Sequence, residues 1–132
     1  LKASGMTIVV STPYMDEASL CDRVSLIQSG EILSSGTPNQ IIRSFPATLF
    51  SVKCKQSIYP LVETLRQKKE ISSAFLFGQE IHVVSKDPGF SANNLGEIIS
   101  QTSFKEISID QITPTIEDCF MLLTDQSNAN YD

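Results

Sequence analysis

Strand patterns and helix patterns follow one another in a fixed order over residues 49–110, and this order limits the folds open to the chain. Runs of β-branched and aromatic residues predict strands, whereas apolar residues spaced three and four apart predict helices. The predicted elements are a strand at 49–54, a helix at 58–69, strands at 71–77 and 80–85, a helix at 91–102 and a strand at 105–110. Gly78 and Gln79 supply the turn between the two middle strands.

The order strand–helix–strand–strand–helix–strand is that of the ferredoxin-like split βαββαβ fold. A further helix is predicted at 115–124, with Thr115 and Asp118 in a capping-box-like relation. Helices would cover one face of the sheet and leave the other free for a partner. We expect an exposed aromatic patch to mark that contact surface if the strand residues divide between the two faces. These residues are Phe50, Val52, Phe75, Phe77, Ile81, Val83, Ile107 and Ile109.

Residues 1–46 carry a different pattern, and Pro46 is the best candidate for a boundary because helices end before a proline. Thr37 and Pro38 are suited to the cap and first position of a helix. The predicted elements are a strand at 6–12 buried in a parallel sheet, a helix at 15–21, a hairpin of 24–28 and 31–34, and a helix at 39–45. We therefore expect an α/β (α+β) chain divided into 1–46, an accessory domain at 47–124 and a flexible tail at 125–132.

The composition bounds the kind of protein. With 41% hydrophobic residues and 19% charged residues, the 132-residue chain has enough apolar surface to fold. Its net charge of −5 disfavours a phosphate-backbone footprint, so no nucleic-acid partner is expected. Cys21, Cys54 and Cys119 are odd in number and widely spaced, which suits reduced thiols in the cytosol. Residues 1–5 lack an initiator Met and a leader, so we expect a piece of a longer protein.

The search for catalytic and metal-binding motifs yields little. The glycines do not have the spacing of a phosphate loop or a dinucleotide fingerprint. His82 has no cysteine or carboxylate nearby in the sequence at ligand spacing, which predicts a structural or exposed histidine rather than a zinc ligand. One histidine far from the serines gives little support for a nucleophile and base. Arg66, Lys68 and Lys69 indicate a solvated helix end.

Several short motifs do carry a resemblance. They are TIVVSTPYMDEA at 7–18, CDRV at 21–24, GEI at 30–32, GTP at 36–38 and TPTIEDCF at 113–120. In order and spacing they resemble the C-terminal part of an ABC transporter ATP-binding subunit, above all one that serves an ABC-2 type exporter. The resemblance is strong over 6–38 and 113–124 and weak between them.

The resemblance implies a fragment of an ATPase subunit. In the family, the phosphate loop, the signature motif and the acidic strand that holds magnesium lie upstream of the segment that 6–38 resembles. The fragment would therefore hold no cofactor and hydrolyse no ATP, while the parent protein would bind ATP and Mg. Its partners would be a second ATP-binding subunit and transmembrane permease subunits, which would hold it in the cytoplasm at the inner face of the membrane. Self-association of the unpaired strand is also expected.

Two functions are open for residues 47–124. The accessory domain would regulate the ATPase or contact other subunits, as the resemblance implies. The alternative is a small-molecule-sensing ferredoxin-like domain that binds an effector between paired modules.

Pro13 is the main departure from the family pattern. The family places a histidine there, which contacts the γ-phosphate and aligns the attacking water, whereas proline has neither a side-chain donor nor a backbone N–H. Either the parent ATP site is impaired, or other groups position the water.

The residues after Pro13 favour the start of an acidic helix over contact with a ligand. They are Tyr14, Met15, Asp16 and Glu17. We expect Asp22 and Arg23 to form a local ion pair or to hold the helix to the next strand.

The first prediction concerns Pro13. The variant Pro13→His in the complete parent protein should hydrolyse ATP faster, because it restores a donor at the γ-phosphate. Steady-state ATPase assays measure this rate. An unchanged rate would show that the residue at this position does not limit hydrolysis.

Overall fold

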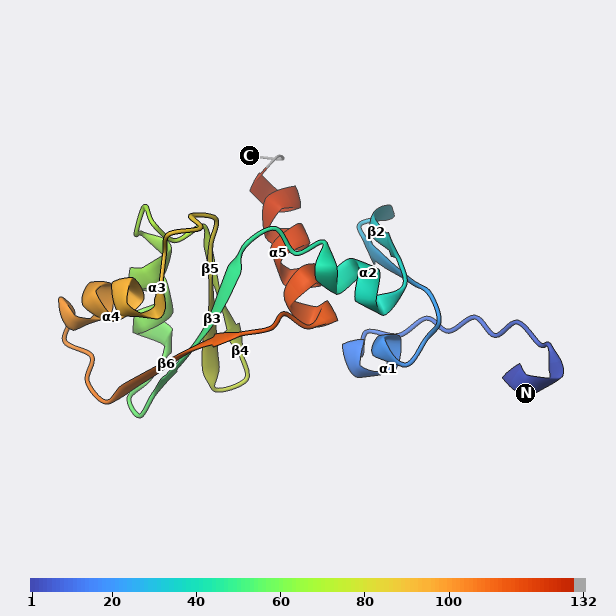
Figure 1. Ribbon diagram of the computed structural model, residues 1–132, viewed down its shortest axis with the longest axis horizontal. Helices are drawn as coiled ribbons and strands as arrows, with labels where there is room; N and C mark the ends of the chain where they lie inside the picture. The colour runs from blue at the N-terminus through green and yellow to red at the C-terminus, as the bar shows by residue number, and fades with distance from the viewer. Residues whose placement is uncertain (130–132) are drawn as a thin grey trace.

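The computed structural model describes residues 1–129, which form two antiparallel sheets and the helices around them (Figure 1). The chain is therefore an α+β protein, as the sequence predicts. The elements are a 3₁₀ turn η1 (Lys2–Ser4), α1 (Met15–Ser19), β1 (Val24–Gln28), β2 (Glu31–Gly36), α2 (Pro38–Arg43), β3 (Thr48–Cys54), α3 (Tyr59–Arg66), β4 (Ser73–Phe77), β5 (Glu80–Ser85), α4 (Ala92–Ser100), β6 (Ile107–Ile112) and α5 (Ile116–Ala129).

The larger sheet has the strand order β4-β5-β3-β6 with every neighbour antiparallel. In this order β5 lies between β3 and β4, and β3 lies between β5 and β6, which is the split βαββαβ arrangement predicted from the sequence. Helices α3 and α4 cover one face (Figure 1). The core on that side contains fully buried Phe50, Leu61, Leu65, Ile81 and Leu95.

The smaller sheet is the hairpin β1–β2, and its turn and the following helix form for local reasons. Ser29 and Gly30 both have positive φ, 51° and 81°, which a two-residue hairpin turn requires. In α2, the Thr37 hydroxyl accepts from the Gln40 backbone N–H, and the Gln40 side chain accepts from the Thr37 N–H. This capping box confirms the predicted helix start at Thr37.

Helix α5 lies between the larger sheet and the β1–β2/α2 unit (Figure 1). One side of it joins Leu26 and Ile41 in a core through Ile116 and Cys119. Its other side joins the sheet through Leu122, which packs with Leu49, Phe75 and Val84. Because the last helix belongs to both cores, residues 1–46 and the sheet are joined by shared packing as well as by the chain.

Two sequence-based expectations about the two ends of the chain are wrong. Residues 6–12 form no strand, because a β ladder needs a neighbour and none of residues 1–129 pairs with them. The polar tail was predicted to begin at residue 125, but α5 continues to Ala129, and residues 130–132 lie outside the described residues. Asp125 is tied down because the Ser73 hydroxyl donates to it at 2.6 Å.

The expected aromatic patch is also absent from the described part of the sheet. The strand residues do divide between the two faces, with Phe50 and Val52 toward α3 and α4. Phe75 is buried under α5, and Phe77 packs beside it against the ring of His82. The aromatic side chains are covered because α5 returns to the face that the sequence left open.

The second prediction tests the shared packing. Leu122→Ala should lower the free energy of unfolding by about 2–5 kcal/mol, because it leaves a cavity between α5 and the sheet. Leu20→Ala is the matched control, since Leu20 is 85% exposed and its removal should change stability by less than about 0.5 kcal/mol. Urea unfolding of both variants measures the difference, and equal stabilities would show that α5 is not packed on the sheet.

Candidate functional site

Pro13 lies in an exposed bend just before α1. The Tyr14 backbone N–H donates to the Thr12 hydroxyl at 3.0 Å, which turns the chain into the helix. Asp16 and Glu17 are exposed in the first turn of α1, where the helix dipole favours acidic side chains. Within the described residues 1–129, Pro13, Asp16 and Glu17 are therefore all exposed to solvent.

Asp22 does not pair with Arg23, contrary to one of the two expectations for these residues. Its carboxylate accepts from the Lys2 ammonium at 2.5 Å, and both side chains are more than two-thirds exposed. An exposed pair of this kind contributes little to stability.

Exposed apolar side chains are concentrated in residues 1–32. Of the ten large hydrophobic residues exposed in the described chain, nine lie in this segment, whereas a folded domain would normally scatter them. They are Leu1, Met6, Ile8, Val9, Val10, Tyr14, Leu20, Ile27 and Ile32. The segment therefore has the character of an interaction surface.

A second cluster of functional groups lies under α5. His82, on β5, is 4% exposed, and its Nδ1 donates to the carboxylate of Asp118 at 2.5 Å. The imidazole stacks on Phe77 with ring centroids 4.2 Å apart and planes 3° apart. Asp118 also accepts from the Thr115 N–H at 2.8 Å and from the Thr115 hydroxyl at 2.9 Å. The same carboxylate therefore begins α5 and fixes it to the sheet.

The Asp118 carboxylate is ionised in this arrangement. Burial opposes ionisation, but the hydrogen bonds from His82 and Thr115 outweigh it and hold the pKa of Asp118 below its ordinary value. The buried negative charge of Asp118 thus has hydrogen-bond donors from both β5 and the start of α5, and it holds the helix to the sheet.

Glu80 extends the cluster toward solvent. It accepts from the Ser51 hydroxyl and lies 3.3 Å from the Lys53 ammonium and 3.8 Å from His82 Nε2. The Ser51 hydrogen bond is the main reason that the pKa of Glu80 is lowered, with Lys53 adding to it and burial opposing it. Asp118, His82, Glu80 and Ser51 thus form one hydrogen-bonded and charged group across β5, β3 and α5.

This group contains an aspartate, a histidine and a serine, but its geometry is not that of a nucleophilic triad. The Ser51 hydroxyl donates to Glu80 rather than to His82, and Ser51 is only 3% exposed. A nucleophile must be accessible and hydrogen-bonded to its base. The group is best explained as a polar anchor for α5.

Cys119 lies next to this anchor and is buried. Burial and the nearby Asp118 charge raise the pKa of the Cys119 thiol to about 11, and the thiol donates to the Ile41 carbonyl at 3.6 Å. Cys119 is therefore protonated at neutral pH and inert as a nucleophile. Within residues 1–129, no group of three or more His, Cys, Asp or Glu side chains is placed to hold a metal ion.

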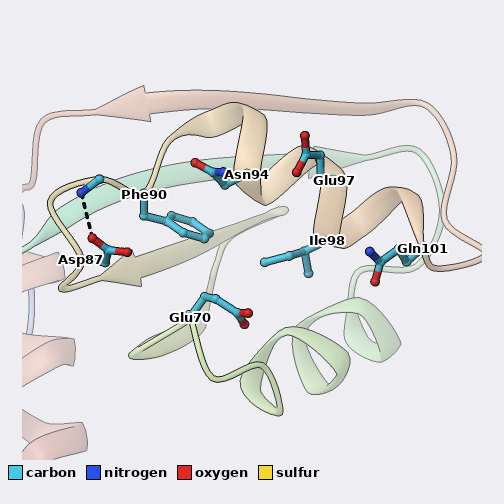
Figure 2. A pocket seen from close by; sticks show the side chains of 8 residues that line it. Glu70, Asp87, Phe90, Asn94, Glu97, Ile98 and Gln101 are labelled. Atoms are coloured by element: carbon cyan, nitrogen blue, oxygen red, sulfur yellow. Dashed lines mark hydrogen bonds between the residues drawn. The ribbon is translucent and has the colours of Figure 1, made fainter.

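A hollow lies on the other side of the larger sheet, beside α4 (Figure 2). It has a volume of about 330 Å³, and its lining includes Glu70, Asp87, Glu97, Asn94 and Phe90. Three carboxylates and no Lys or Arg line it, so its charge opposes the phosphates of a nucleotide. None of the residues singled out in the sequence lies there.

The His82–Asp118 contact was missed in the sequence because 36 residues separate the two side chains. One signal was the capping-box relation of Thr115 and Asp118, which explains the helix start but not the histidine. A second signal was His82, a polar residue between the apolar Ile81 and Val83 of the predicted strand at 80–85.

Comparisons with known proteins give the chain its relatives, although no family model matches it. A probable multidrug ABC transporter ATP-binding protein, YbhF of Escherichia coli, is 26% identical over 92% of this chain and 20% of its own length. Nod factor export ATP-binding protein I of Rhizobium is 30% identical over 58% of the chain and 27% of its own length. ABC transporter G family member 23 of Dictyostelium discoideum is 28% identical over 65% of the chain and 11% of its own length.

These three relatives are named as ABC transporter ATP-binding, export ATP-binding or ABC transporter proteins, which confirms the resemblance carried by the motifs. The chain is a homologue of the C-terminal part of ABC transporter ATP-binding proteins. It spans about a fifth of the Escherichia coli relative, and that likeness covers the ferredoxin-like part as well as residues 1–46. In residues 1–129 no helix is both long enough and apolar enough to cross a bilayer.

The third prediction concerns the polar anchor. Asp118→Asn should destabilise the protein by about 1–3 kcal/mol at neutral pH, because buried donors lose an ionised acceptor. Since the folded pKa of Asp118 is lowered, its contribution is complete above the unfolded value of about 3.9 and is lost as pH falls through the folded pKa. The stability difference between the two proteins should therefore narrow below about pH 4 in urea titrations.

Glu31→Gln provides the control for this measurement, because Glu31 is an exposed carboxylate on β2. A difference that stays constant from neutral pH to about pH 3 would contradict an ionised Asp118 anchor.

Proposed function

We propose that the chain is the C-terminal part of the ATP-binding subunit of an ABC-2 type exporter, in which residues 47–129 act as a regulatory and subunit-interaction domain without hydrolysing ATP. The observation that carries the proposal is the double packing of α5, which is buried against Leu26 and Ile41 on one side and Leu49 and Val84 on the other. A domain joined to its neighbour in this way transmits displacements instead of moving independently.

The exposed apolar surface of residues 1–32 supports the first half of the proposal. Val9 is 91% exposed and Ile8 is 54% exposed in an extended segment that has hydrogen-bonding groups to offer along its backbone. We place this surface against the remainder of the ATP-binding subunit, where it would gain both burial and a strand neighbour. These relatives are more than twice as long as this chain, so they have the residues to cover it.

The relatives' names support export as the process. One relative is named as a probable multidrug transporter protein and another as a Nod factor export protein. In the proposed subunit, ATP and Mg bind to other residues, and the partners are a second ATP-binding subunit and the permease subunits at the inner face of the membrane. The acidic lining of the hollow beside α4 agrees with a nucleotide site elsewhere.

Regulation would act through α5 in this proposal. A change in the position of α1 or α2 displaces the side of α5 that carries Ile116 and Cys119, and the Asp118–His82 and Asp125–Ser73 hydrogen bonds carry that displacement to the sheet. The route also operates in reverse, because coupling between two sites is reciprocal.

The fourth prediction tests this route in the complete subunit assembled with its permease. Leu122→Asp places a charge between α5 and the sheet. It should change kcat for ATP hydrolysis about twofold or more while KM for ATP stays constant, because in this proposal ATP binds to residues outside α5. Tyr59→Asp is the matched control, since Tyr59 is 67% exposed on α3.

The milder Leu122→Ala variant keeps the test interpretable if the aspartate variant does not fold. Unchanged kcat and KM in both Leu122 variants would exclude a regulatory role for residues 47–129.

A further inference from the structure

The two edges of the larger sheet differ in how they are protected. At the β4 edge, Arg66 from α3 donates its Nε–H to the Ala74 carbonyl at 2.8 Å and also pairs with Glu63. At the β6 edge, no hydrogen bond from residues 1–129 reaches the outward backbone groups of Ile107–Ile112. An unpaired regular strand is a template for another strand.

β6 also lacks the usual features that discourage pairing. It pairs with β3 over six consecutive residues without a register shift, and it contains no proline or lysine. Its single charged residue is Asp110, which is exposed together with Ser108 on the face away from α4. The strand therefore has the regular pairing and the low charge that allow a second strand to pair along its whole length.

We propose that β6 is a self-pairing edge, at which two copies of this chain join their sheets into one antiparallel eight-stranded sheet. A two-fold axis gives both copies the same contacts, so a single strand can serve both sides of the interface. The proposal concerns an interaction surface of this chain itself and does not depend on the function proposed above.

The charges along β6 distinguish between the registers centred on its three middle residues, Ser108, Ile109 and Asp110. With the two-fold axis at Asp110 the two Asp110 carboxylates would face each other, and with the axis at Ser108 each Asp110 would face Glu106 of the second copy. With the axis at Ile109, each Asp110 faces Ser108 of the second copy, so a hydroxyl donates to a carboxylate twice. The register centred on Ile109 is the one of these three that opposes no like charges.

Lys53 adds charge complementarity to that register. It lies on β3 directly beside Ser108 of β6 and is on the same face of the sheet. Its side chain is 56% exposed, and its ammonium lies 3.3 Å from the Glu80 carboxylate on β5, the neighbour of β3 on the side away from β6. In the joined sheet the residue beyond Ser108 in this row is Asp110 of the second copy, so the Lys53 charge lies between two carboxylates, Glu80 of its own chain and Asp110 across the interface, and is attracted to both. This attraction favours a second copy over an unrelated strand.

The fifth prediction is tested by sedimentation equilibrium of the full chain at about 1 to 300 µM, the range of weak and small interfaces. The wild-type chain should form dimers. Ser108→Asp should weaken dimerisation about tenfold, because it opposes two pairs of like charges, and the new carboxylate beside Lys53 leaves the fold itself unstrained. The double variant S108D/D110K should restore dimers, because the opposed pairs then have opposite charges.

Ser57→Asp is the matched control, since it adds the same charge in an exposed loop before α3. Hydrogen exchange of residues 107–112 should slow with protein concentration in the wild type and not in Ser108→Asp. A monomer throughout the concentration range would overturn the proposal. So would a dimer that Ser108→Asp does not weaken and Val9→Lys does, because association would then occur through residues 6–10.

Discussion

The burial of α5 between two apolar cores is the constraint on which the rest of the structure depends. The β1–β2 hairpin with α2 is a small unit, and its core consists largely of side chains that need α5 to exclude water. The sheet face opposite α3 and α4 also needs α5 to exclude water, since Leu49, Phe75 and Val84 would be exposed without Leu122. Burial of apolar surface is the main stabilising contribution in small domains, so one helix that serves two cores stabilises both.

The polar anchor gives this apolar contact a defined position. Apolar packing is nondirectional, whereas the His82–Asp118 hydrogen bond fixes which turn of α5 meets β5. Asp118 has all its buried oxygen contacts supplied by His82 and Thr115, which makes an ionised side chain tolerable there. The same residue that caps the helix therefore sets its register on the sheet, and this is why the regulatory proposal rests on α5.

The motifs that resemble an ATP-binding subunit and the motifs that build the fold occupy different places. Residues 6–18 carry the strongest resemblance, yet they make few contacts within residues 1–129 and expose their apolar side chains. Residues 48–112 carry none of the short motifs that resemble the family but form the best-packed part of the structure. The motifs in residues 6–18 thus contribute little to the packing of the described chain, whereas residues 48–112 form its main core.

The sequence by itself determined the elements that depend on neighbours in the chain. The Thr37 cap, the Ser29–Gly30 turn and the βαββαβ order were predictable, because capping, turn geometry and apolar periodicity act within a few residues. Only the tertiary structure decided that residues 6–12 form no strand and that α5 covers Phe75 and Phe77. It also decided that His82 pairs with Asp118. Each of these depends on a partner distant in sequence: a strand needs a second strand, a sheet face needs a layer, and a buried charge needs a hydrogen-bond donor.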